Sequence, residues 1–144
     1  MAGREVGGIG HGIAVLVAAE RGDGPGEASR LAERLVGYRV FPDSAGRMNR
    51  SVLEAGGGVL LVPQFTLAAD TRKGMRPSFA GAAEPDAARH LFDDLAAAVR
   101  RTEPAGGVAC GEFGADMRVA LVNDGPVTFW LDAPPKPAPA TGSR

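Results

Sequence analysis

The chain has 144 residues, of which 44% are hydrophobic and 23% charged, and its net charge is −1. This length predicts one domain that can bury its own core. The balanced charge excludes no class of protein, but it is not typical of one that grips long nucleic acid non-specifically, which would usually be basic. A single cysteine, Cys110, excludes an internal disulfide and is typical of a reducing compartment. No apolar run reaches the length of a membrane span. We therefore expect a cytoplasmic protein whose contacts with any nucleic acid are local.

The first half of the chain predicts a buried strand, an amphipathic helix and several short strands. Apolar residues run without interruption from Ile13 to Ala18, as in a buried strand. Between Glu27 and Gly37 the apolar positions recur at helical spacing. The other expected strands are short and are separated by glycine-rich turns: Glu5 to Ile9, Tyr38 to Phe41, and Met48 to Leu53.

The second half predicts a strand, a long helix and a terminal hairpin. Val59 to Val62 forms a continuous apolar strand, and Pro85 suits the first turn of a helix that continues to about Arg101. Alternating residues from Met117 to Leu121 and from Val127 to Leu131 predict two strands around a turn. The fold class is therefore α+β or mixed α/β, with two helices on a sheet. Residues 1–132 form the single domain, and we expect the proline- and alanine-rich tail 133–144 to be disordered.

Familiar catalytic and cofactor patterns are missing from the sequence. Two histidines and one cysteine give no metal-ligand spacing. There is no Gly-x-Ser-x-Gly elbow, and the glycine runs at 7–12 and 56–58 match neither dinucleotide nor phosphate-loop patterns, so we interpret them as turns. Glu112 and Asp116 are close enough to act as an acid and a base, but such pairs in polar turns are usually solvated. We expect neither a metal nor a cofactor.

An irregular strand end is the first candidate site. Pro63 interrupts the apolar strand because it cannot donate a hydrogen bond to the sheet, and Gln64, Phe65 and Thr66 follow it. Such an irregularity frees backbone N–H groups beside polar side chains, which is a common way to form a binding site. The pattern is equally consistent with an edge-strand proline that has no function.

The second candidate is the turn at 123–128. Asp124-Gly125 is a strong hairpin signal, and a plain hairpin turn is one interpretation. However, Pro126 removes a donor directly after the turn, and a Gly-Pro bond can be cis. The second interpretation is therefore a turn that projects its carbonyl groups outward.

Several segments in register resemble the signature stretches of the D-aminoacyl-tRNA deacylases, also called D-tyrosyl-tRNA deacylases. The resemblance covers about residues 5 to 132, and several long motifs in one order are far more specific than a single pattern. The main segments are Gln64-Phe65-Thr66-Leu67, the loop 69–79, Gly111-Glu112-Phe113-Gly114-Ala115-Asp116-Met117 and Asn123-Asp124-Gly125-Pro126-Val127-Thr128. Gly37-Tyr38-Arg39-Val40-Phe41 and Gly46-Arg47-Met48-Asn49 match as well.

The resemblance implies a homodimeric cytoplasmic enzyme with a barrel-like, β-rich sheet and two packed helices. Such enzymes hydrolyse the ester between a D-amino acid, or glycine mischarged on tRNA(Ala), and the 3′-terminal adenosine of tRNA. In this family the bond matching Gly125-Pro126 is cis and enters the pocket of the other subunit, where carbonyl groups exclude an L side chain. By the same resemblance, the catalytic residues are Gln64, Phe65 and Thr66, the substrate-binding residues Pro63, Phe113, Gly114, Met117, Gly125, Pro126 and Thr128, and the tRNA phosphate contacts Arg72, Lys73 and Arg76.

These residues suit ester hydrolysis by positioning. Backbone N–H groups of Phe65 and Thr66 can stabilise the developing oxyanion, whereas Thr66 without a neighbouring base is a weak nucleophile. Phe113 and Met117 offer an aromatic face and a pliable thioether to a base. We therefore expect the adenosine 2′-hydroxyl and a water molecule to perform the chemistry while the protein positions the ester.

The sequence departs from the family pattern in two places. Family members usually begin with an additional strand-turn-strand before the part that Glu5 begins to match, so we expect an unpaired sheet edge here. Pro63 replaces the usual serine and is typical of a branch that deacylates L-alanyl-tRNA, although Phe65 and Gly125-Pro126 favour the D-specific branch. Three alternatives therefore remain: an L-alanyl-tRNA deacylase, an inactive tRNA-binding paralogue, and a purely structural β-rich dimer.

Overall fold

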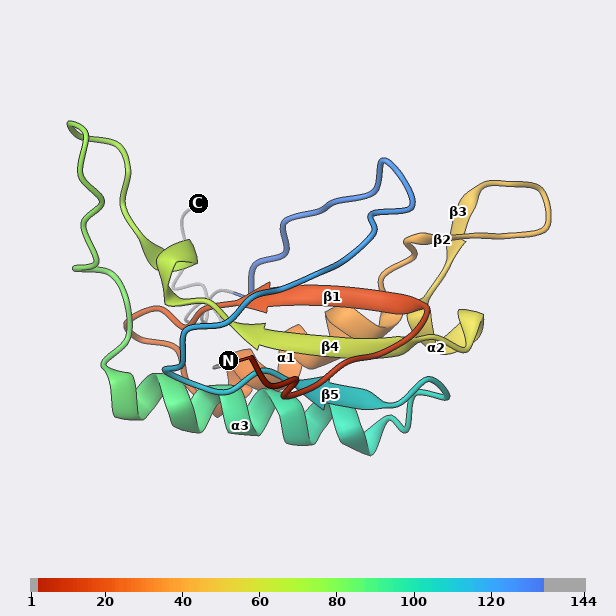
Figure 1. Cartoon of the computed structure of the whole chain (residues 1–144), viewed down its shortest axis with the longest axis horizontal. Coiled ribbons are helices and arrows are strands. Elements are labelled where there is room, and N and C mark those ends of the chain that lie inside the picture. Colours follow the sequence, from red (N-terminus) through yellow and green to blue (C-terminus); the bar gives the residue numbers. More distant parts are fainter. Residues whose placement is uncertain (1–2, 134–144) are drawn as a thin grey trace, which may run out of the picture.

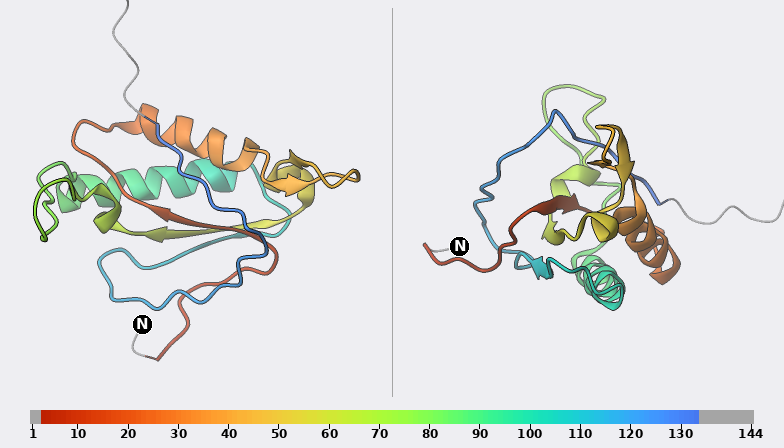
Figure 2. Two further views of the ribbon diagram at one scale, coloured as in Figure 1. Left: turned by 90° about the horizontal axis from the view of Figure 1, so that it is seen from above. Right: turned by 90° about the vertical axis from the view of Figure 1, so that its right-hand side faces the viewer.

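The computed structural model describes residues 3–133 and has a three-stranded parallel sheet at its centre. Strands β1 (Gly12–Val17), β4 (Gly58–Pro63) and β5 (Val108–Cys110) lie side by side in the order β1-β4-β5 (Figure 1). Helices α1 (Pro25–Gly37) and α3 (Pro85–Arg101) belong to the two crossovers between these strands. Both helices cover the same face of the sheet (Figure 2). The predicted α/β class with two packed helices is therefore confirmed.

Smaller elements lie at the amino-terminal end of β4. Strands β2 (Phe41–Pro42) and β3 (Met48–Arg50) form a short antiparallel ribbon, and α2 (Val52–Ala55) follows it directly. The predicted strand from Met48 to Leu53 thus ends early, because Ser51 caps a helix. Its hydroxyl accepts a hydrogen bond from the Glu54 N–H at 3.1 Å, and the Glu54 carboxylate accepts one from the Ser51 N–H at 2.9 Å.

Both long helices begin at a proline and bury one apolar face. At the start of α1 the Glu27 carboxylate accepts a hydrogen bond from the Gly24 N–H at 2.5 Å, and this bond lowers the pKa of Glu27. Their buried side chains recur at three- and four-residue spacing, as predicted for helices that pack on a sheet. These side chains are Ala28, Ala32, Leu35 and Val36 of α1 and Phe92, Leu95, Ala96 and Val99 of α3.

The core lies between the helices and the sheet. Val59 and Leu61 of β4 are completely buried, and both belong to the same apolar cluster as the buried side chains of α1 and α3. In β1, Ile13, Val15 and Val17 pack against this cluster, whereas Ala14 and Leu16 are exposed on the other face. That face lies toward the segment after β5, and β1 forms one edge of the described sheet, as expected (Figure 2).

Gly58 is in tight contact with the backbone at the start of the sheet. A Cβ atom built on it would lie 2.6 Å from the carbonyl oxygen of Gly106, which is closer than real Cβ atoms approach. The sequence prediction of a turn at 56–58 is confirmed only in part. Gly56 ends α2 with a φ of +70°, but Gly58 is the first residue of β4, where only a glycine fits between the neighbouring segments.

Three sequence predictions about strands are wrong, and a fourth, the strand from Tyr38 to Phe41, is correct only at Phe41, where β2 begins. Residues 5–9 form no strand, and neither do the two arms of the predicted hairpin, 117–121 and 127–131. The alternating pattern of those arms is present, but no described segment pairs with them in a strand ladder. The main sheet is accordingly an open one with edges, and the described residues do not close into a barrel. The predicted disordered tail lies outside the described residues, except for residue 133.

Candidate functional site

The candidate site begins where β4 leaves the sheet. Pro63 is the last residue of β4 and stands opposite Val17, and the Gln64 N–H still donates to the Val17 carbonyl oxygen at 2.7 Å. The chain then turns into a short 3₁₀ helix, η1 (Phe65–Ala68). The first N–H groups of a helix have no partner within it. Accordingly, neither the Phe65 nor the Thr66 N–H donates a hydrogen bond to another described residue.

The side chains of this segment interact with one another rather than with a catalytic base. Gln64 donates from Nε2 to the Thr66 hydroxyl oxygen at 2.6 Å, and within residues 3–133 no histidine or carboxylate contacts that hydroxyl. The Phe65 ring is 62% exposed and rests against Phe79, with 5.1 Å between ring centroids. Thr66 therefore has no group that would activate it as a nucleophile, whereas free N–H donors and the exposed ring of Phe65 lie next to it.

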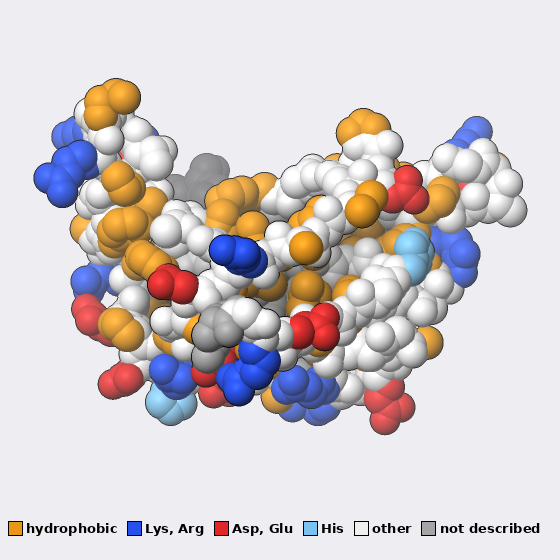
Figure 3. Space-filling view, in the orientation of Figure 1, with side chains coloured by type: hydrophobic (Ala, Val, Ile, Leu, Met, Phe, Trp, Pro, Cys, Tyr) orange, Lys and Arg blue, Asp and Glu red, His pale blue; other side chains and the backbone are white. Residues whose placement is uncertain are grey.

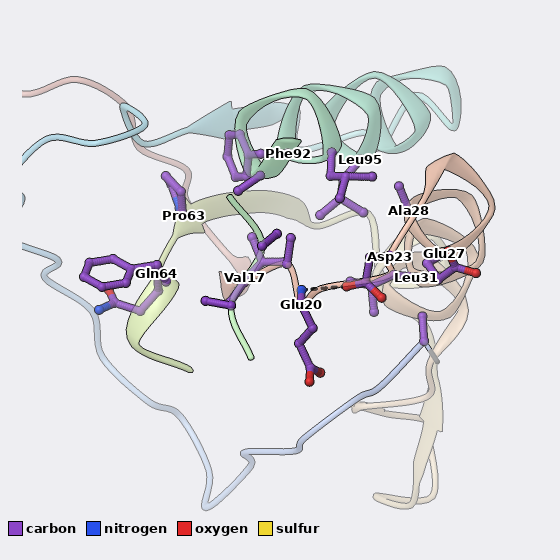
Figure 4. A pocket seen from close by; sticks show the side chains of 18 of the residues that line it. Val17, Glu20, Asp23, Glu27, Ala28, Leu31, Pro63, Gln64, Phe92 and Leu95 are labelled. Atoms are coloured by element: carbon purple, nitrogen blue, oxygen red, sulfur yellow. Dashed lines mark hydrogen bonds between the residues drawn. The ribbon is translucent and has the colours of Figure 1, made fainter. Parts of the chain in front are cut away.

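A cavity of about 410 Å³ opens beside this segment, at the carboxyl ends of the parallel strands. Its walls come from α1, α3 and the strand ends, and Figure 4 shows Leu31 of α1 and Phe92 and Leu95 of α3 around it. Pro63, Gln64 and Phe65 line the cavity, but Thr66 does not. In open parallel sheets, this carboxyl edge is where ligands bind.

Phe113 brings the segment after β5 to the same cavity. Its ring lies 6.4 Å from the Phe92 ring and 4.9 Å from the guanidinium carbon of Arg89, measured from the centroid of Phe113. Gly114 follows with a φ of +79°, a left-handed conformation that favours glycine. The Met117 sulfur accepts a hydrogen bond from the Glu112 N–H at 3.3 Å. Of the three residues predicted around the adenine, only Phe113 lines the cavity; Gly114 and Met117 do not.

The Gly125-Pro126 turn lies outside the cavity, in a groove next to it. Its peptide bond is cis, as the resemblance implies, and Asn123 donates to the Thr128 hydroxyl across the turn at 3.1 Å. Gly125, Pro126 and Thr128 line a second groove of about 1460 Å³, whose other wall includes residues of β1. This groove adjoins the cavity, because the two share lining residues such as Val17 and Leu131. None of the three lines the cavity beside Phe65. Within one chain, the structure therefore does not bring the two predicted parts of the pocket together.

The predicted phosphate contacts lie on the exposed loop that follows η1. Arg72, Lys73 and Arg76 are all exposed, and Lys and Arg side chains gather on this loop in Figure 3. However, Arg72 already binds Asp70, through Nε at 2.9 Å and Nη2 at 2.8 Å. The guanidinium bonds, and then the Arg72 N–H, hold the pKa of the Asp70 carboxyl well below its usual range. Lys73 and Arg76 make no ion pair with any described residue.

Sequence reasoning missed the acidic part of the cavity wall. Four carboxylates line the side of the cavity near the start of α1 and the end of the described chain, and Arg21 among them binds Glu84 at 3.3 Å. In the sequence, residues 21–26 have the composition of an ordinary glycine-rich turn, although three of these carboxylates lie in it or directly beside it. The Asp70-x-Arg72 spacing, in contrast, is a recognisable turn signal. The four carboxylates belong to Glu20, Asp23, Glu27 and Asp132.

Metal centres and membrane-spanning helices are two further features that would indicate a function. Histidine, cysteine and acidic side chains of residues 3–133 form no group of three that could hold a metal ion. Over the same residues, none of the helices is both long enough and apolar enough to cross a membrane.

The fold and the cavity define an open α/β protein with a cavity, lined in part by aromatic side chains, at the carboxyl edge of its sheet. Comparison with known proteins identifies the family. The chain belongs to the D-Tyr-tRNA(Tyr) deacylase family, whose model matches residues 1–132.

Curated relatives are similar over nearly their whole length. The D-aminoacyl-tRNA deacylase of Halorhodospira halophila is 62% identical over 136 residues, which cover 94% of this chain and 88% of the relative. That of Methylococcus capsulatus is also 62% identical, covering 95% and 88%. Among solved structures, the c-Myc DNA unwinding element binding protein has a TM-score of 0.82 at 34% identity, covering 88% of this chain and 85% of that chain. A structure described as a probable eukaryotic D-amino acid tRNA deacylase has a TM-score of 0.62 at 18% identity, covering 75% and 77%, which shows the shared fold.

Proposed function

We propose that this chain hydrolyses the ester bond of D-aminoacyl-tRNA, and of glycyl-tRNA mischarged on tRNA(Ala), releasing the amino acid and the free tRNA. The observation that carries this proposal is the 62% identity, over 94% of the chain, to a D-aminoacyl-tRNA deacylase. The reaction is a carboxylic ester hydrolysis that removes wrongly charged amino acids before translation uses them. A cytoplasmic location follows from that role.

The local geometry supports a mechanism based on positioning. The N–H groups of Phe65 and Thr66 are the oxyanion donors, because neither is engaged by another described residue. Gln64 holds the Thr66 hydroxyl through the 2.6 Å hydrogen bond, which fixes the segment without creating a base. The 2′-hydroxyl of the terminal adenosine then assists a water molecule in attacking the ester carbonyl.

The surroundings of the cavity suggest how the end of the tRNA is held. The Phe113 ring offers its face to the adenine, and Gly114 and Met117 lie close to it in the sequence, just outside the residues that line the cavity. Lys73 and Arg76 contact phosphates of the acceptor end, and Arg72 joins them by exchanging its bonds to Asp70 for bonds to phosphate.

The separation of Gly125-Pro126 from the cavity supports a homodimer. This turn does not line the cavity beside Phe65, and in a homodimer it would contact the ester by entering the pocket of the second chain. There its carbonyl groups, with Thr128 beside them, leave no room for an L side chain at the α-carbon. Selectivity for D-amino acids and glycine then results from exclusion.

The proposal is tested with D-tyrosyl-, glycyl-, L-tyrosyl- and L-alanyl-tRNA as substrates of the full chain. We expect hydrolysis of the first two and none of the L esters. Hydrolysis of L-alanyl-tRNA alone would instead assign the chain to the branch indicated by Pro63. Binding of tRNA with every ester left intact would contradict the enzyme and indicate a binding protein.

A second experiment tests the mechanism. D-tyrosyl-tRNA that carries 2′-deoxyadenosine at its 3′ end should be bound but not hydrolysed, because the assisting hydroxyl is missing. Thr66→Val removes the side-chain hydroxyl but keeps the backbone N–H, so it should retain most of the activity. If Thr66→Val abolished hydrolysis and the deoxy substrate reacted normally, the threonine would be the nucleophile and the mechanism would be wrong.

A further inference from the structure

Arg89 occupies a distinctive position beside the cavity. It lies on the exposed side of α3, and its guanidinium carbon is 4.9 Å from the centroid of the Phe113 ring, within the range of a cation–π contact. Phe113 lines the cavity but Arg89 does not, so Arg89 contacts the ring from outside the cavity. The contact joins α3 to the segment that follows β5.

The charged residues that line the cavity itself are mostly acidic. The cavity wall includes the carboxylates of Glu20, Asp23 and Asp132, which would repel a phosphate. Arg21 also lines the cavity, but it is bound to the Glu84 carboxylate at 3.3 Å and to the Ala80 carbonyl oxygen at 2.5 Å.

Arg89, in contrast, is available to a ligand. No carboxylate within the described part of the chain forms an ion pair with it, and its side chain is exposed. A nucleotide whose base rests on Phe113 would therefore have, beside that ring, an arginine with no carboxylate partner among the described residues. The carboxylates belong to other residues of the cavity wall.

We propose that Arg89 is a further substrate-binding residue, which holds the 5′-phosphate of the terminal nucleotide while the base rests against Phe113. This inference relies on the proposed function, because that function supplies the adenosine. Guanidinium groups bind phosphate through charge-assisted hydrogen bonds that neutral side chains cannot replace. The same contact gives the nucleotide a direction, with its phosphate toward Arg89 and away from the carboxylates.

The test compares the binding of 5′-AMP and adenosine to the full chain by calorimetry. Wild-type protein should bind 5′-AMP roughly tenfold more tightly than adenosine, the size expected of one charge-assisted contact. Arg89→Gln should abolish that difference, and Arg89→Lys should keep part of it, because lysine supplies the charge without the planar fork. Arg101→Gln is the matched control, since Arg101 is an exposed arginine in the last turn of the same helix.

Hydrolysis kinetics separate this inference from the proposed function. With D-tyrosyl-tRNA, Arg89→Gln should raise KM about three- to tenfold while kcat changes by less than about twofold, because a phosphate contact is made equally in the ground and transition states. If wild-type enzyme is active and Arg89→Gln changes neither KM nor the preference for 5′-AMP, the inference is wrong and the function stands. If no ester is hydrolysed but the preference for 5′-AMP still depends on Arg89, the function is wrong and the nucleotide site stands.

Discussion

The close contact between Gly58 and the loop before β5 predicts a large effect from a single methyl group. In Gly58→Ala the new Cβ would lie 2.6 Å from the Gly106 oxygen, 3.0 Å from the Gly106 carbonyl carbon and 3.2 Å from the Gly107 oxygen. All three are backbone atoms, so no side chain can rotate away. Overpacking of a core usually lowers the free energy of unfolding by about 1–3 kcal/mol, and we expect at least the upper end of that range here. Against a typical total of about 5–15 kcal/mol, such a loss is severe.

Two other glycines complete a graded series. A Cβ on Gly57 would meet its nearest atom, the Gly12 Cα, at 3.0 Å, so Gly57→Ala should lower the free energy of unfolding by about 1 kcal/mol. Gly37, at the end of α1, has nothing within 4 Å. Gly37→Ala should therefore raise stability by about 0.4–1 kcal/mol through the unfolded state. Urea unfolding followed by circular dichroism, at one protein concentration, measures all three. A Gly58→Ala variant as stable as wild type would show that β4 and the 106–107 segment are not this close.

The remaining predictions concern single side chains. Asp70→Asn should free Arg72 and make the dependence of tRNA binding on log salt steeper by about one phosphate contact, whereas an unchanged slope would show that the pair does not compete with phosphate. The pKa of Asp70 is lowered in the folded state, so its pairing with Arg72 stabilises the fold above the pKa that the carboxyl has in the unfolded chain. This stabilisation is lost as the pH falls through the folded pKa. NMR titration should find a lower pKa for Asp70 in wild type than in Arg72→Gln, and equal values would contradict the pairing. Burial raises the pKa of the Cys110 thiol, and the Arg100 guanidinium, 3.4 Å from the sulfur, opposes this rise. Iodoacetamide should therefore alkylate Cys110 slowly in wild type and more slowly still in Arg100→Gln. Faster alkylation of the variant would contradict the contact between Arg100 and Cys110. Ser51→Ala removes the cap of α2 and should lower the free energy of unfolding by about 1 kcal/mol, and a smaller loss than a few tenths in urea would show that the cap is not formed.

The helices and buried strands could be predicted from local patterns because each buries one continuous apolar surface. In β4 the apolar residues Val59, Leu61 and Val62 are buried, as the continuous run from Val59 to Val62 predicts. In α3 the buried residues follow the three- and four-residue spacing that begins after Pro85. The hairpin expected after Met117 fails for the opposite reason. Val119 and Leu121 alternate with Arg118 and Ala120, a pattern that suits a strand with two different faces. The pattern does not supply a neighbouring strand, and the side chains of Val119 and Leu121 are exposed in this chain.

The candidate site was predictable where one segment forms it and unpredictable where distant segments meet. The end of the strand is marked in the sequence by Pro63, and the free N–H groups of Phe65 and Thr66 belong to the first turn of η1, which follows directly. The contact of Arg89 with Phe113 joins residues of two separate elements, and no pattern in α3 distinguishes Arg89 from an ordinary solvated arginine. The pairing of Arg72 with Asp70 is local in the sequence. The sequence shows that Arg72 is charged but not that its guanidinium meets the Asp70 carboxylate, so Arg72 was predicted only as a phosphate contact.

The distribution of the site over the chain separates catalysis from selectivity. The donors at Phe65 and Thr66 and the ring of Phe113 lie on segments that leave the carboxyl edge of one sheet, so a single chain positions them relative to each other. Gly125-Pro126 lies in another groove and contributes nothing to that cavity. Under the proposed function, the elements that polarise the ester thus belong to one chain, and the carbonyl wall that rejects an L side chain must come from a second. Recognition of the wrong enantiomer is then a property of the interface, while the tendency to hydrolyse an ester is a property of the strand end.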